Sequence, residues 1–187
     1  MILYPKHERA LFLQIATGTS RYNGGMKSEM IATPNMVPVT KPYKIPRSTL
    51  IVIYTPDLDV LLIERADRPG FWQSVTGSQD EGETIEQTAV REVYEETGLV
   101  ATEYKLTDWK KQSSYEIYKI WAHRYAPGMI HNTEHIFSLA VSQRVPVKLA
   151  PREHLQHVWL PYEQAAMLCF SSTNREAILE LPARLEK

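Results

Sequence analysis

The segment GSQDEGETIEQTAVREVYEETGL, residues 77–99, carries the strongest structural pattern in the chain. Thr84 followed three residues later by Gln87 has the form of a capping box, and Gly98 is typical of the residue just after a helix. No proline or glycine interrupts the span between Thr84 and Gly98. The segment therefore predicts a helix from Thr84 to Thr97, with a loop before it and a turn after it.

The acidic residues of this helix fall on its apolar side. At about 100° per residue, Glu92 and Glu96 lie within or beside the apolar stripe, whereas Glu95 lies farther round. The stripe consists of Ile85, Ala89 and Val93. Two carboxylates about 5 Å apart repel by roughly 3 kcal/mol at an effective dielectric constant near 20. A positive charge must therefore lie close to them.

Either a basic side chain or a metal ion can supply this charge. Oxygen ligands one helical turn apart favour Mg²⁺ or Mn²⁺ over zinc, and the segment has no histidine or cysteine. Arg91 faces another side of the helix, where we expect it to hold the preceding loop through backbone carbonyls or to orient a glutamate. Gly77 is expected to end a strand with a sharp turn, and Gly82 to lie in the loop.

Strand and helix patterns flank this segment on both sides. The predicted strands span residues 49–54, 60–64, 71–77, 115–125, 135–141 and 157–160, and the first two form a hairpin. Pro161 opens a helix through Leu168, and Thr173 with Glu176 forms a second capping box for a helix at residues 174–181. This order predicts an α/β domain with a mixed sheet between helices.

Composition indicates one domain and a small partner. The 187 residues, 43% hydrophobic and 23% charged, suffice for one sizeable core. A net charge of -1 without a long basic run gives no electrostatic basis for binding nucleic acid or an anionic membrane. No apolar run approaches the roughly 18 residues of a membrane span. We expect a small charged substrate and no obligate protein partner.

Residues 1–42 lack periodicity and contain turn-rich stretches, so they predict a poorly structured extension before a domain at 43–187. A start codon read too far upstream and a functional arm are both open explanations for it. The single cysteine, Cys169, is expected to be a small buried residue, and its lack of a disulfide partner favours the cytoplasm. The histidines show no zinc spacing and are expected in loops or on the surface.

Residues 77–99 resemble the Nudix box, G-x5-E-x7-R-E-U-x-E-E-x-G-U with U aliphatic, at every fixed position. The matching residues are Gly77, Glu83, Arg91, Glu92, Val93, Glu95, Glu96, Gly98 and Leu99. The resemblance implies a Nudix α/β/α sandwich whose loop–helix–loop binds divalent cations and hydrolyses a nucleoside diphosphate linked to another group. Such chemistry agrees with the acidic helix, since a pyrophosphate group needs bridging Mg²⁺ to approach it.

Within this family, residues 43–187 resemble the dihydroneopterin triphosphate diphosphatases of bacterial folate synthesis. The likeness rests on the stretches KIPRS, RADRPGFWQSVTGS, HRYAPG, NTEH, EHLQHVWL and SSTNREA. It implies Mg-dependent hydrolysis of 7,8-dihydroneopterin triphosphate to the monophosphate and pyrophosphate, with Mn²⁺ as a possible replacement. Ile45 departs from the family's Lys-Arg-Pro pattern after Lys44, and one phosphate contact is therefore missing.

The same likeness implies which residues act. The metal ligands are Glu92, Glu96 and Glu153, with Arg91 in support, and Glu83, Glu95 and Glu153 all remain candidates for the general base. The implied substrate contacts are Lys44, Arg65, Thr76, Tyr115, Glu116, Ile117, Tyr118, Glu153 and Ser171. Lys44 and Arg65 suit phosphate oxygens, and the tyrosines suit a flat pterin.

Two other functions compete with this interpretation. The first is a Nudix pyrophosphohydrolase of (d)NTPs such as dATP or of dinucleoside polyphosphates, and Tyr115 and Tyr118 are compatible with the latter. The second is a non-catalytic Nudix ligand sensor. Sensors of this kind typically lose box glutamates, whereas this chain keeps all of them.

Overall fold

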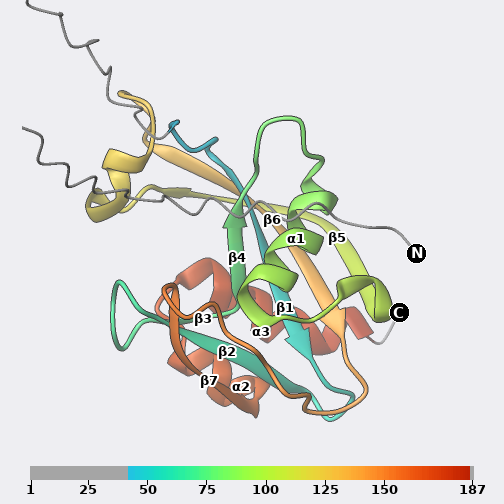
Figure 1. Cartoon of the computed structure of the whole chain (residues 1–187). Coiled ribbons are helices and arrows are strands. Elements are labelled where there is room, and N and C mark those ends of the chain that lie inside the picture. Colours follow the sequence, from blue (N-terminus) through green and yellow to red (C-terminus); the bar gives the residue numbers. More distant parts are fainter. Residues whose placement is uncertain (1–41, 186–187) are drawn as a thin grey trace, which may run out of the picture. The chain divides into compact units, whose positions relative to one another are not determined.

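The computed structural model describes residues 42–185, so the predicted extension lies outside the described residues apart from Pro42. The described part is an α/β fold with one seven-stranded sheet, and Figure 1 shows how its helices and strands are arranged. The strands are β1 (Arg47–Tyr54), β2 (Asp59–Arg65), β3 (Trp72–Gln73), β4 (Val75–Ser78), β5 (Lys105–Glu116), β6 (His131–Ala140) and β7 (His154–Pro161). The helices are α1 (Ile85–Thr97), α2 (Tyr162–Leu168) and α3 (Ser172–Leu185), with short 3-10 helices η1 (Ala101–Glu103) and η2 (Lys119–Arg124). The predicted fold class is confirmed.

The sheet is mixed, and it forks along one edge of β1. On the opposite edge, β1 pairs in parallel with β6 over its whole length, and β5 continues the sheet antiparallel to β6. On the forked edge, β4 pairs with residues 48–51, whereas β2 pairs with β1 at Tyr54. β2 then pairs with β3 and β7. The sheet therefore has two arms on this side, one made of β4 and one of β2, β3 and β7.

Helices cover both faces of the sheet because the central strands are apolar on both faces (Figure 1). In β1, Leu50 and Val52 belong to the core formed with α2 and α3, whereas Ile51 and Ile53 belong to the core formed with α1. Successive residues of a strand point to opposite faces, so an unbroken apolar run is what a doubly covered strand requires. The hairpin of the first two predicted strands and the helix at residues 162–168 are confirmed.

The predicted strand at residues 115–125 is wrong. The strand in this region, β5, ends at Glu116, and residues 119–124 form η2. β5 escaped prediction because it is an edge strand on which Trp109 is the one buried residue, and because a bulge between Asp108 and Lys111 breaks its alternation. The aromatic residues after β5 give a strand-like sequence pattern, but Tyr118, Trp121 and Tyr125 form part of a cavity wall instead.

Three smaller predictions also need correction. The segment at 71–77 divides into β3 and β4, and β6 begins at His131 inside a predicted loop. α3 begins at Ser172, so Thr173 does not cap it. The Thr173 hydroxyl instead donates a hydrogen bond of 2.8 Å to Glu134 Oε2 on β6. A long-range contact has therefore replaced the local one that the sequence pattern suggested.

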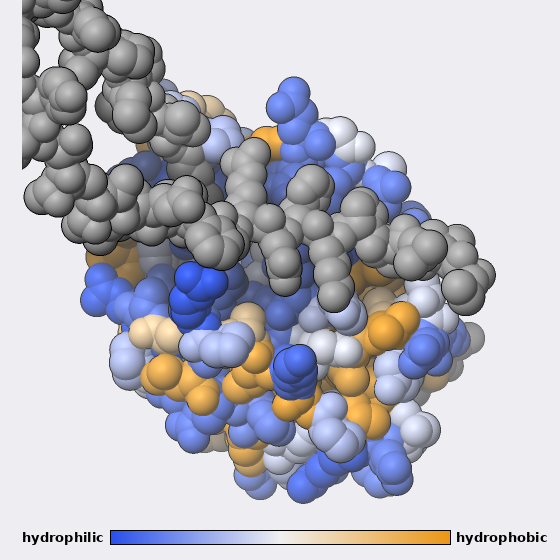
Figure 2. Space-filling view, viewed as in Figure 1, coloured by the Kyte–Doolittle hydropathy of each residue, from blue (hydrophilic) through white to orange (hydrophobic). Residues whose placement is uncertain are grey.

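The surface of the described part mixes polar and apolar side chains. On the face in Figure 2, hydrophilic and hydrophobic residues are interspersed. Met167 and Ile130 are among the exposed large apolar residues. None of the helices in residues 42–185 has both the length and the apolar character needed to cross a membrane.

Candidate active site

A cavity of about 930 Å³ lies between the two arms of the sheet. Small-molecule sites usually have volumes of about 300–1,000 Å³. The predicted site residues that line it are Lys44, Arg65, Thr76, Arg91, Glu92, Glu95, Glu96, Tyr115, Ile117, Tyr118, Glu153 and Ser171. Glu83 and Glu116 are not part of its wall. Residues from distant parts of the chain thus meet in one concave site.

Glu92 and Glu96 bring one half-buried and one buried carboxylate to the cavity. Their side chains are 12% and 6% exposed, respectively. Burial raises the pKa of Glu92 to about 8, with a further increase from the Glu96 carboxylate, while Arg91 opposes both effects. Burial also raises the pKa of Glu96, although contact with His154 and a 3.1 Å hydrogen bond from the Thr76 N–H stabilise its carboxylate. The helix therefore carries both groups on its buried side, as its sequence predicts.

Gly77 leaves the space that Glu92 occupies. This glycine lies within β4 and has no positive φ, so the predicted sharp turn is wrong. A Cβ atom at position 77 would lie 1.7 Å from Cδ of Glu92. Glycine is therefore required here because the carboxylate packs directly against the strand backbone.

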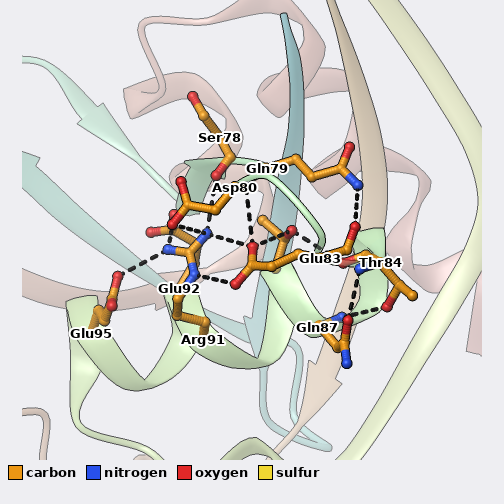
Figure 3. Close-up of polar contacts among 10 residues, drawn as sticks. Ser78, Gln79, Asp80, Glu83, Thr84, Gln87, Arg91, Glu92 and Glu95 are labelled. Atoms are coloured by element: carbon orange, nitrogen blue, oxygen red, sulfur yellow. Dashed lines mark hydrogen bonds and ion pairs between the residues drawn. The ribbon is translucent and has the colours of Figure 1, made fainter. Parts of the chain in front are cut away.

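Arg91 ties α1 to the loop that precedes it, as Figure 3 shows. Its Nε and Nη2 donate to the two carboxylate oxygens of Glu83 at 2.7 and 2.9 Å. Nη1 donates to Glu92 at 2.7 Å and to Glu95 at 3.0 Å, and Nη2 donates to the carbonyl oxygen of Ser78 at 3.0 Å. Arg91 therefore makes both kinds of contact expected of it.

Glu83 is the most strongly bound of the candidate bases. Besides Arg91, it accepts hydrogen bonds from the Thr88 hydroxyl at 2.9 Å and from the Asp80 N–H at 3.2 Å. The hydrogen bonds from Arg91 are the main cause that lowers the pKa of Glu83 to about 2. A carboxylate held in this way is a weak base, and its position suits it to ordering the loop.

Glu153 and His154, at the start of β7, lie beside Glu96. Each of the three offers an atom within 4.8 Å of the others, and His154 Nε2 lies 3.0 Å from Glu96 Oε1. His154 is buried, so the expectation that every histidine lies in a loop or on the surface is wrong for it. Because β7 pairs with β2, and Glu96 of α1 also accepts a hydrogen bond from Thr76 of β4, the Glu96 carboxylate contacts both arms of the sheet.

The arrangement fits a divalent cation. Within the described residues, Arg91 is the cation in contact with Glu92, and no ion pair with Lys or Arg involves Glu96. The one guanidinium, that of Arg91, is shared by Glu83, Glu92 and Glu95. The carboxylates of Glu92 and Glu96 therefore carry negative charge that a metal ion would balance. Glu92, Glu96 and Glu153 would supply hard oxygen ligands, which Mg²⁺ and Mn²⁺ prefer.

Aromatic and basic side chains form another part of the wall. Tyr118 packs against Trp121 and Phe170, with ring centroids 5.4 and 6.0 Å apart. The Arg65 guanidinium lies 4.6 Å from the Trp121 ring centroid and donates to both carboxylate oxygens of Asp67 at 2.8 Å. Lys44 Nζ donates to Ser78 Oγ at 3.2 Å. These contacts hold the basic groups in place on the cavity wall.

Several residues of the wall had no recognisable sequence pattern. They are Ser48, Asp67, Gln73, Trp121, Tyr125, Glu134, His154, Phe170 and Asn174. Glu116 is an expected substrate contact that does not line the cavity, because strand alternation places it on the face opposite Tyr115. Alternation within β5 would have separated these two residues, had the strand itself been recognised.

Comparison of the sequence with known proteins finds the NUDIX domain model over residues 44–181. Dihydroneopterin triphosphate diphosphatase of Escherichia coli K12 is 46% identical over 141 residues, which are 74% of this chain and 93% of that protein. The Haemophilus influenzae enzyme of the same name is 39% identical over 140 residues, 73% of this chain and 87% of that protein. These matches confirm the resemblance drawn from the sequence.

Solved structures of related proteins have the same fold as this chain. The structure of E. coli dihydroneopterin triphosphate pyrophosphohydrolase has a TM-score of 0.69 at 46% identity, covering 74% of this chain and 95% of that one. A Caenorhabditis elegans Ap4A hydrolase has a TM-score of 0.61 at 20% identity, covering 75% and 97%, and shows the shared fold. The family model and the two enzymes together establish that the chain belongs to the Nudix family of hydrolases, which generally use a divalent metal ion.

Proposed function

We propose that this chain hydrolyses 7,8-dihydroneopterin triphosphate to dihydroneopterin monophosphate and pyrophosphate, using Mg²⁺ or, in its place, Mn²⁺. The observation that carries the proposal is the 46% identity over 141 residues to an enzyme named for this reaction. The cavity supports it, because buried carboxylates and aromatic side chains line the same space. Cys169 is a buried free thiol, which fits a reducing compartment, so we place the reaction in the cytoplasm.

In the proposed reaction, the oxygen of a water molecule attacks phosphorus in the α–β anhydride link. The P–O bond of that link breaks, its electron pair stays on the leaving oxygen, and a carboxylate accepts the proton of the water. Glu92, Glu96 and Glu153 would hold Mg²⁺, which would supply positive charge for the phosphates and the transition state. Arg91 keeps Glu92 and the loop in position, while Lys44 and Arg65 bind phosphate oxygens.

The proton acceptor is either Glu95 or Glu153 in this proposal. Glu83 is excluded because its carboxylate is already bound by Arg91, Thr88 and Asp80. The Glu95 side chain is 54% exposed and keeps one contact with Arg91. The pH dependence of kcat in Glu95→Gln and in Glu153→Gln shows which of the two glutamates is the base. Loss of the true base removes the rise of kcat with pH on the acidic side of the profile.

A substrate panel tests the function. The wild-type enzyme at fixed Mg²⁺ should show a higher kcat/KM for dihydroneopterin triphosphate than for dATP, 8-oxo-dGTP or a dinucleoside tetraphosphate. Glu96→Gln should lower kcat about 100-fold or more, in the range typical for loss of an essential catalytic group. Glu176→Gln changes an exposed glutamate of α3 outside the cavity and serves as the matched control. A clear preference for a nucleotide would reject the pterin assignment.

A further inference from the structure

Glu134 is a buried carboxyl group in the cavity wall that the mechanism above does not use. It lies on β6 beside Ser48 of β1, and it is 4% exposed. Among the residues described, Thr173 is the one side chain that donates a hydrogen bond to it, at 2.8 Å to Oε2. Burial raises the pKa of Glu134 to about 7, and the bond from Thr173 opposes this rise. A buried carboxyl with a single donor is costly unless a ligand completes its hydrogen bonds.

The neighbouring residues do not complete the hydrogen bonds of the Glu134 carboxyl group. In the described part of the chain, Glu134 takes part in no ion pair with Lys, Arg or His, unlike Glu92 and Glu96. Asn174, another residue of this wall, is already bound to the backbone N–H and the hydroxyl of Ser74 at 2.8 Å each. The hydroxyl of Tyr115 accepts a hydrogen bond from Asn132 at 3.1 Å. Glu134 therefore keeps the capacity to accept further hydrogen bonds from a ligand in the cavity.

The position of Glu134 makes it suited to the ring of the substrate rather than to its phosphates. Phosphate oxygens carry negative charge and have no N–H groups, so a carboxyl without a cation repels them. Glu134 lies on the sheet face that α3 covers, together with Leu50, whereas Glu92 and Glu96 come from α1 on the other face. Ser171, one of the expected substrate contacts, lies 3.0 Å from the Thr173 hydroxyl that binds Glu134.

We propose that Glu134 determines specificity by accepting hydrogen bonds from the two adjacent N–H groups of a 2-amino-4-oxopyrimidine ring. Thr173 holds one carboxylate oxygen, which fixes the plane of the acceptor pair. Pterin and guanine share this donor–donor edge. Adenine presents an acceptor beside its amino group and does not match. The inference rests on the proposed function, since it concerns which ring accompanies the phosphates.

Paired substrates test the contact directly. dGTP and dITP differ by the 2-amino group alone, so the ratio of their kcat/KM values measures recognition of that group. Wild-type enzyme should prefer dGTP roughly 10- to 100-fold, as expected for a hydrogen bond to a charged acceptor. In Glu134→Gln the ratio should fall to within about threefold of unity, and kcat/KM for dihydroneopterin triphosphate should fall with that for dGTP. Turnover of dATP should stay within about threefold of wild type, which shows that the catalytic groups are intact.

A dGTP/dITP ratio that is the same in wild type and Glu134→Gln would overturn the inference, as would an equal loss on every substrate. If Glu134→Gln does not fold, Thr173→Val frees the carboxylate and should lower the ratio about threefold. An unchanged ratio there would equally reject the contact. Glu176→Gln is the control. The proposed function fails separately if the wild-type enzyme has a higher kcat/KM for dATP than for the pterin. The wild-type kcat/KM values for dGTP and for the pterin show which of the two rings the enzyme prefers.

Discussion

Gly77 has no side chain, and this absence determines where the charged side chain of Glu92 can lie. The Glu92 carboxylate occupies the volume in which a Cβ atom of residue 77 would lie. The same carboxylate is bound to Arg91 at 2.7 Å, so it has little freedom to retreat. A methyl group at this position would therefore move the proposed metal ligand rather than the strand.

Gly77→Ala should lower kcat by about 100-fold, because a proposed metal ligand displaced by an ångström or more no longer holds its position. The loss should appear at saturating substrate and Mg²⁺, with the circular dichroism spectrum unchanged. Gly128→Ala is the control. Its φ of +86° makes alanine strained there, but a Cβ would meet nothing within 4 Å. That variant should lose some thermal stability and keep its activity, and similar activity in both variants would contradict the displacement of Glu92.

The two glutamates that α1 contributes to the site could be predicted from the helical pattern, and basic residues of the wall such as Lys44 and Arg65 from the family resemblance, whereas other residues of the wall could not. Glu92 and Glu96 stand out because helical periodicity places them among apolar positions, and Arg91 lies in the same segment. Glu134 and His154 give no such sign, since each is buried by partners far away in sequence. Glu134 meets Thr173 through β6 and α3, and His154 meets Glu96 through β7 and α1. Such pairings depend on strand order, which local pattern does not encode.

Among the elements, α1 is fixed most strongly by its own sequence. The Thr84 hydroxyl accepts from the Gln87 N–H at 3.2 Å, and the Gln87 side chain accepts from the Thr84 N–H at 2.7 Å. At the other end, Gly98 adopts the left-handed conformation with φ of 71°. The capping box and the terminal glycine are therefore confirmed, and the predicted boundaries of the helix agree with the structure.

Thr84→Ala should destabilise the protein by about 1 kcal/mol, because it leaves an N–H of the first turn without its acceptor. For a chain of this size the melting temperature should fall by about 2–4 °C. Activity at 25 °C should be retained, since the folded population remains large. Thr84→Ser keeps the hydroxyl and should melt close to the wild type. Equal melting of the alanine variant and wild type, measured by calorimetry, would show that the cap contributes nothing.

β5 illustrates the elements that sequence analysis missed. Alternating exposed and half-buried residues over a bulged edge strand give a weak apolar signal. β1 and β2 gave a strong one, because both of their faces are buried. Elements at the centre of the sheet could thus be predicted from their composition, whereas the edge strand depends on a neighbour for its definition.

At the scale of the whole molecule, Glu134 should make stability depend on pH. Its pKa is raised from 4.5 to about 7, so the folded protein holds the proton more tightly than the unfolded chain does. Stability from this group is fully present below about pH 4.5 and is lost as the pH rises through about 7, by roughly 3 kcal/mol at most. Tyr115 and Tyr125, the titratable groups that interact with it, have pKa values raised above 10.0 and do not titrate in this window.

Glu134→Gln removes this effect. The melting temperature of the variant minus that of wild type should therefore increase by several degrees between pH 5 and pH 8, measured without metal or substrate. Other glutamates, including Glu92 and Glu96, titrate in both proteins and cancel in the difference. Glu176→Gln should give a difference that does not vary with pH. A constant difference for Glu134→Gln as well would contradict the raised pKa.

The parallel pairing of β1 with β6 also affects how the protein is made. β1 ends at Tyr54, whereas β6 begins at His131. During translation, β1 leaves the ribosome long before β6 has been synthesised. The edge of β1 that pairs with β6 therefore stays without a partner during this time. Exposed strand edges of this kind readily pair with other chains. Slow translation between these strands, or scarcity of chaperones, would therefore favour aggregation of the nascent chain over completion of the sheet.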